Sequence, residues 1–202
     1  MSEHIVWQDA HTLAVGGRGW PDATWNRLPA RAQALVPPDL WEKSTQPAGV
    51  WVGFHTTAPT VHVHWRVTNP ELGRHNAPAI GQSGLDVYAR DAAGRWRGLT
   101  VGLPTARDNL GPPIAGMQPG HPEYLVYLPI RNALEVLEFG VAPGEQLMPA
   151  PAFTGLPLVY YGTSIVPGQG ASRPGMGHAS ILGRRLDRPV INLGFGVVKR
   201  VL

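Results

Sequence analysis

Apolar and polar residues alternate with a period of two through the middle of the chain, which is typical of half-buried β-strands. The alternation is clearest at residues 61–67, where one face carries Val61, Val63, Trp65 and Val67 and the other carries His62, His64 and Arg66. The same reasoning predicts strands at 50–55, 85–90, 95–101, 124–129 and 134–141, with a turn at 91–94. Short strands in this number, with no strong helix between them, favour an antiparallel β-sandwich or jelly roll over residues 1–152.

The pattern changes after Pro143, where a proline-rich connector leads into a continuous apolar run at residues 158–162. Such a run is typical of a strand that is buried on both faces of a parallel sheet. A helical segment at 176–185 and a second apolar strand at 189–194 follow. This strand–helix–strand order predicts a right-handed βαβ unit, so residues 153–202 are expected to begin an α/β domain.

Composition narrows the class of protein further. The 202 residues hold 25 Gly and 21 Pro, too many for a helical bundle, and no Cys, which excludes disulfides, thiolate metal sites and a cysteine nucleophile. The net charge is only +3 and the arginines are scattered, which argues against nucleic acid as a partner. No apolar run is long enough to span a membrane and no signal peptide is visible, so we expect a cytoplasmic location without a membrane partner.

Ser164 is the residue whose position suggests chemistry, because it follows the first apolar strand of the βαβ unit. Ligand sites of open α/β sheets lie beyond the carboxyl ends of their strands. A serine there can present its hydroxyl to a cleft while backbone N–H groups face a developing oxyanion. Spacing alone also fits an ordinary turn or helix-capping serine, and Gly162-Thr163-Ser164-Ile165-Val166 departs from the G-x-S-x-G pattern at its last position.

The segments around this serine resemble those of the SGNH/GDSL hydrolases, and in particular esterases with a β-sandwich ahead of the catalytic domain. The resemblance covers about residues 20–195, and its most specific part is the block around the serine. The segments that carry it are 161–165, 171–176 and 186–195, together with 25–29, 83–88, 124–129 and 135–140. It implies a serine esterase acting on acyl esters of small molecules or carbohydrates, including acetylated carbohydrate, with no cofactor.

The resemblance implies Ser164 as the nucleophile and Gly196 as a candidate oxyanion donor, one place before the family's usual position. The family also needs an Asn in a third block and an Asp-x-x-His, which supplies the base that takes the serine proton. The chain lacks both: His178 is the one histidine after Ser164, position 175 is Gly, and His178 is interpreted as a helix-surface residue. We therefore expect a sandwich fused to the first fifty residues of a catalytic domain, truncated within that domain and inactive as this chain.

Two alternatives stay open. The chain could be a non-catalytic carbohydrate-binding β-sandwich, because it holds seven Trp and exposed aromatic rings stack on sugars. It could also be a cupin-like metal protein through His62 and His64, which project together from one strand face. That metal site would need a glutamate at position 68 or 69, which are Thr68 and Asn69, so no metal is expected. The oligomeric state does not follow from the sequence.

Overall fold

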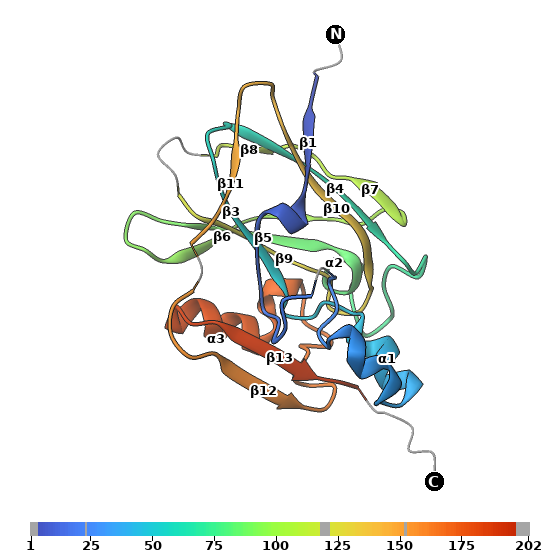
Figure 1. The fold of residues 1–202 in the computed structure, drawn as a ribbon. Helices are drawn as coiled ribbons and strands as arrows, with labels where there is room; N and C mark the ends of the chain where they lie inside the picture. The colour runs from blue at the N-terminus through green and yellow to red at the C-terminus, as the bar shows by residue number, and fades with distance from the viewer. Residues whose placement is uncertain (1–3, 23, 118–121, 152, 197–202) are drawn as a thin grey trace.

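The computed structural model describes residues 4–22, 24–117, 122–151 and 153–196, and most of them form two antiparallel sheets packed face to face (Figure 1). The first sheet has the order β1 (Val6–Asp9), β10 (Leu134–Val141), β4 (Thr60–Val67) and β7 (Asp108–Leu110), and β8 (Ile114–Ala115) also pairs with β4. The second has the order β11 (Leu147–Pro149), β3 (Trp51–Thr56), β9 (Tyr124–Tyr127), β5 (Leu85–Arg90) and β6 (Trp96–Gly102), and β2 (Ala14–Gly16) pairs with β3. The predicted mostly-β fold with an antiparallel sandwich is confirmed.

The core lies between these two sheets and follows from the alternation in the sequence. In β4, Val61, Val63, Trp65 and Val67 are buried, whereas the residues between them are half-buried on the outer face. The Trp65 ring is fully buried, and its indole N–H donates to the Ser83 carbonyl at 3.1 Å, so no polar group of that ring is left unpaired.

The predicted βαβ unit is present as β12 (Leu158–Gly162), α3 (His178–Leu186) and β13 (Val190–Gly194), with β12 and β13 parallel. Figure 1 shows α3 between this two-stranded sheet and the sandwich. The expectation that the apolar run 158–162 is buried on both faces is wrong, since Val159 is 58% exposed and Tyr161 85% exposed. The physical reason is that α3 and the sandwich cover only one face of these two strands.

Several short elements were not predicted. Residues 30–34 form a 3₁₀ helix, and α1 (Pro38–Ser44) begins with proline in its first turn, where a missing N–H costs nothing. Helix α2 (Ala79–Ser83) and strands β7 and β8 also lie in segments without a clear period. Among the described residues, no helix has the length and apolar character needed to cross a bilayer.

Candidate functional site

Ser164 lies just beyond the carboxyl end of β12 and is half-buried. The turn that carries it is tight, because Val166 N–H donates to the Thr163 carbonyl at 3.1 Å. The chain folds back so closely that a Cβ on Gly162 would come within 2.9 Å of the Val166 side chain. The glycine therefore lets the serine turn sit directly over the strand end.

Gly196 follows β13 in the same way that Ser164 follows β12. Gly162 and Gly194 are register partners in the parallel pair, and each candidate residue lies two positions further on. Phe195 N–H donates to the Gly162 carbonyl at 2.9 Å, which holds the two strand ends together. Within the described residues, the backbone N–H groups of Ser164 and Gly196 donate no hydrogen bond, so both are available to an acceptor.

Asn192 links these two strand ends, and its role was missed by sequence reasoning. Its buried side chain donates from Nδ2 to the Val166 carbonyl at 3.0 Å and accepts from Gly194 N–H at Oδ1, also at 3.0 Å. One amide therefore fixes the serine turn against the segment that leads to Gly196. The signal in the sequence was an amide residue inside an otherwise apolar strand.

Arg27 of the sandwich region reaches into the same strand end. Its guanidinium donates to the carbonyls of Gly194, Asn192 (3.2 Å), Lys43 (2.9 Å) and Gln46 (2.7 Å). It also lies 4.4 Å from the centre of the Phe195 ring. Burial lowers the pKa of Arg27 to about 9, which still leaves it charged at neutral pH. The residue thus holds the segment 192–196 on the sandwich.

Asp86 makes a second attachment, on the chain between Ser164 and α3. Its carboxylate accepts from Gly175 N–H at 2.9 Å and from Tyr88 Oη at 3.1 Å, and pairs with Arg173 at 3.2 Å. Burial raises the pKa of Asp86, opposed by the charge of Arg173 and by these hydrogen bonds. A Cβ on Gly175 would lie 2.4 Å from the Tyr88 ring, so only glycine allows this close approach.

His178 does not supply a base for the serine in the part of the chain that the structure describes. It is exposed at the first position of α3, and its ring makes an edge contact with Tyr160 at 5.7 Å between centroids. Across residues 4–22, 24–117, 122–151 and 153–196, no imidazole or carboxylate is hydrogen bonded to the Ser164 hydroxyl. The described residues therefore place no base beside Ser164.

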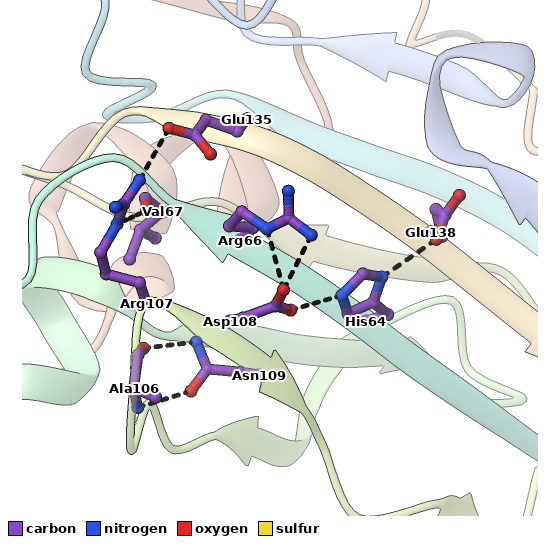
Figure 2. A network of polar contacts seen from close by, with 9 residues as sticks. All are labelled: His64, Arg66, Val67, Ala106, Arg107, Asp108, Asn109, Glu135 and Glu138. Atoms are coloured by element: carbon purple, nitrogen blue, oxygen red, sulfur yellow. Dashed lines mark hydrogen bonds and ion pairs between the residues drawn. The ribbon is translucent and has the colours of Figure 1, made fainter.

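His64, proposed above as one half of a metal pair, belongs instead to an ionic network on the outer face of the first sheet. Figure 2 shows its two ring nitrogens facing different carboxylates, Nδ1 with Glu138 at 3.0 Å and Nε2 with Asp108 at 2.6 Å, while Arg66 also pairs with Asp108 at 2.8 Å. Burial lowers the pKa of His64, but the bonds to Glu138 and Asp108 outweigh it and the net pKa is raised. Because both ring nitrogens are engaged by carboxylates, neither is free for a metal, and no group of three suitable ligands exists among the described residues.

Comparisons with known proteins give matches to both parts of the chain. The family description "N-terminus of Esterase_SGNH_hydro-type", also called GxDLY, matches residues 5–147, and the GDSL-like lipase/acylhydrolase family matches residues 156–200. Residues 84–88 read Gly-Leu-Asp-Val-Tyr, so Asp86 and Tyr88 stand at the acidic and aromatic positions of GxDLY. No curated protein matches the sequence.

Among solved structures, the chain is similar to a putative GDSL-like lipase from Bacteroides ovatus ATCC 8483, with 29% identity and a TM-score of 0.87 over 95% of this chain and 56% of that one. A salicylyl-acyltransferase from a tetracycline biosynthetic pathway shares the fold at 19% identity and a TM-score of 0.73, covering 95% and 54% of the two chains. A family two carbohydrate esterase from Cellvibrio japonicus shares it at 11% and 0.55, covering 96% and 53%. The chain thus spans about half the length of these structures, and it belongs to the SGNH hydrolase-type esterase family, whose N-terminal domain it carries.

Proposed function

We propose that this chain contributes the serine nucleophile and two oxyanion donors of an esterase that acts on acyl esters, with acetylated carbohydrate as the substrate class. The observation that carries the proposal is that Ser164 and Gly196 leave adjacent parallel strands at matched positions. Attack of the Ser164 oxygen on the ester carbonyl would form an acyl-enzyme and release the alcohol. The N–H groups of Ser164 and Gly196 would stabilise the oxyanion.

The carbohydrate class is supported by the fold shared with the carbohydrate esterase from Cellvibrio japonicus. A serine hydroxyl needs a base to lose its proton, and the described residues bring none to Ser164. We therefore expect the 202-residue chain alone to hydrolyse esters no faster than its Ser164→Ala variant. Rapid ester turnover by the chain that is abolished in Ser164→Ala would contradict the expected lack of activity, but it would support Ser164 as the nucleophile.

The test of the nucleophile supplies the base from solution. The chain is incubated with 4-nitrophenyl acetate and imidazole, and acetylation of individual serines is followed by mass spectrometry. Ser164 is expected to gain an acetyl group about tenfold faster than Ser172, an exposed serine of the same loop, because Ser164 follows the strand end that pairs with the segment leading to Gly196. Equal rates at the two serines would sink the proposal.

Gly196 offers a matched pair of variants for the oxyanion role. Gly196→Pro removes the N–H and is expected to slow the acetylation of Ser164, whereas Gly196→Ala keeps it. A Cβ at this position lies 3.4 Å from the Gln169 side chain, so alanine fits with little adjustment. Equal slowing by both variants would show that the effect is steric rather than a loss of the donor.

A second candidate function is glycan binding by the sandwich without catalysis, and one observation favours it. Trp7 is 38% exposed and lies beside His62 and His64, with ring centroids 6.4 and 6.1 Å apart. An aromatic ring bordered by polar groups suits the face of a sugar. Binding of a neutral oligosaccharide such as cellohexaose that is lost in Trp7→Ala but kept in Ser164→Ala would support this function over the first.

A further inference from the structure

Five arginines line one groove on the side of the molecule where the β5–β6 hairpin faces α3. The groove is about 610 Å³ in volume and lies apart from the serine turn 162–170 and the segment 192–196, none of whose residues line it. Its lining includes Arg95, Arg97, Arg173, Arg184 and Arg185, and Asp187 is its one carboxylate among the described residues. This concentration of charge is unusual in a chain with a net charge of only +3.

The carboxylates near the groove cancel only part of its charge, and one of them, Asp86, is paired with Arg173 at 3.2 Å. Asp187 is already bound by Arg90, at 2.6 Å. Asp91 accepts from the Nε atoms of Arg95 and Arg97, at 3.2 and 3.0 Å. In the described part of the chain, the terminal amino groups of these two arginines donate no hydrogen bond, so they stay available to another acceptor.

Two buried donors on the lining residues have no acceptor among the described residues. Arg184 lies flat against Tyr88, 3.8 Å from its ring centre, and its Nη2 donates to the Gly175 carbonyl at 2.7 Å. The Nη1 atom of Arg184 is buried and has no hydrogen-bond partner among the described residues, and the same is true of the indole Nε1 of Trp96. Buried donors without acceptors are rare because each loses its hydrogen bond to water, and Arg184 and Trp96 both line the groove.

We propose that this groove binds the carboxylate or phosphate group of a small, sugar-sized anionic ligand. Guanidinium groups recognise these two oxyanions through paired hydrogen bonds, and the volume is within the range of small-molecule sites. An anionic group would accept from the terminal amino groups of Arg95 and Arg97 and balance the charge of Arg97 and Arg185. The proposal is independent of ester hydrolysis, because it uses none of the residues around Ser164.

The test measures binding to the full chain by calorimetry with three probes: trigalacturonate, a neutral trisaccharide of the same size, and inorganic phosphate. We expect binding of trigalacturonate, phosphate or both, weakening as salt is raised, and no binding of the neutral sugar. Tighter binding of trigalacturonate would identify a sugar carboxylate as the group recognised, and tighter binding of phosphate a phosphate ester. Absence of binding by both anions, or equal binding of the neutral sugar, would overturn the proposal.

Charge reversals locate the binding. Arg97→Glu and Arg185→Glu are each expected to weaken the anion about tenfold, through loss of one charged contact. Arg31→Glu, at an exposed arginine in the 3₁₀ helix Ala30–Ala34, makes the same change in net charge away from the groove and is expected to alter affinity less than about twofold. A loss as large in Arg31→Glu as in the groove variants would show that only the overall charge matters and would contradict the site.

Discussion

The two faces of the second sheet are buried by different kinds of contact. Its inner face meets the first sheet in one large apolar cluster that includes Val52, Leu85, Val126 and Phe139. Its outer face carries a much smaller apolar cluster, Trp51, Tyr88, Leu125 and Tyr127, and the guanidinium group of Arg184, from α3, lies over two of these rings. The sandwich is therefore held by the hydrophobic effect, whereas the βαβ unit is seated largely by directional polar contacts.

The two kinds of contact have different effects: one stabilises the packed sheets, and the other fixes the positions of particular backbone atoms. Burial of apolar area is strong but non-directional, so it holds the sheets together without fixing any atom to a fraction of an ångström. The hydrogen bonds that Arg27 donates and that Asp86 accepts add little net stability while both partners are present, yet they specify where the backbone at Gly194 and Gly175 lies. A candidate site built on strand ends needs that kind of placement.

The largest expected effect is in the apolar core. Phe139→Ala removes a fully buried ring that lies against Phe54, with 5.1 Å between centroids, and leaves a cavity between the sheets. We expect the free energy of unfolding, measured by urea denaturation, to fall by about 3–5 kcal/mol. Leu110→Ala, at a leucine 70% exposed on the first sheet, is the control and is expected to cost less than about 0.5 kcal/mol. Similar losses in the two variants would contradict the assignment of the core.

The next effect is local to the βαβ unit. Arg27→Ala removes a donor from each of four carbonyl groups, and we expect a loss of about 2–4 kcal/mol in stability. Hydrogen exchange should show lost protection at residues 192–195 while the amides of β4 and β9 stay protected. Arg27→Lys is expected to recover only part of the loss, because an ammonium cannot reach carbonyls in several directions at once.

Arg18→Ala is the matched control for Arg27, since Arg18 also donates to backbone carbonyls, those of Asp22 and Thr24, but within its own loop. It is expected to leave exchange at residues 192–195 unchanged. If Arg27→Ala instead loses protection evenly over the sandwich, then the sandwich and the βαβ unit unfold together. That result would contradict a separate role for polar contacts in seating the βαβ unit.

A smaller effect concerns two aspartates, Asp86 and Asp91, whose contributions to stability change with pH in opposite directions. Burial raises the pKa of Asp86, so the folded chain binds that proton more tightly than the unfolded chain does. Stability is therefore expected to fall as pH rises from about 3.8 through the raised pKa of Asp86, and this decline should disappear in Asp86→Asn. Urea denaturation at a series of pH values measures it.

Asp91 provides the opposite case. The backbone N–H of Arg95, followed by the side chain of Arg97, lowers its pKa to about 2. Its contribution to stability is present above about pH 3.8 and is lost as pH falls toward about 2. Asp91→Asn should remove that loss at low pH. The same sign of change in the two asparagine variants would contradict the buried position of Asp86.

The smallest effect concerns the network on the outer face of the first sheet. The raised pKa of His64 means that its stabilisation is fully present below about pH 6.5 and is lost as pH rises through the raised value. His64→Gln should flatten this part of the stability profile by less than about 1 kcal/mol, as expected for a partly exposed ion pair. His62→Gln, on the same face, is the control, and an equal flattening there would argue against the network of Figure 2.

The sequence predicted the strands that carry strong alternation, and it placed Ser164 and Gly196 just after the strands of a parallel pair. Strands such as β7 and β8 were missed because two or three residues are too few to show a period, and their pairing with β4 depends on partners distant in sequence. Burial of β12 on both faces was inferred from its apolar run, but exposure depends on what covers a strand rather than on its own residues.

The alternation of apolar and polar residues, and the order of the strands along the chain, are determined by the sequence by itself. The reason is that the direction of side chains along a strand follows from the backbone alone. For that reason the sandwich, the parallel strand pair and the serine at a strand end could be predicted from the sequence. Only the tertiary structure decided that Arg27 holds Gly194, that Asp86 holds Gly175, and that arginines from a hairpin and a helix share one groove. These contacts join residues far apart in the chain, and their energies depend on distances and burial that no local pattern encodes.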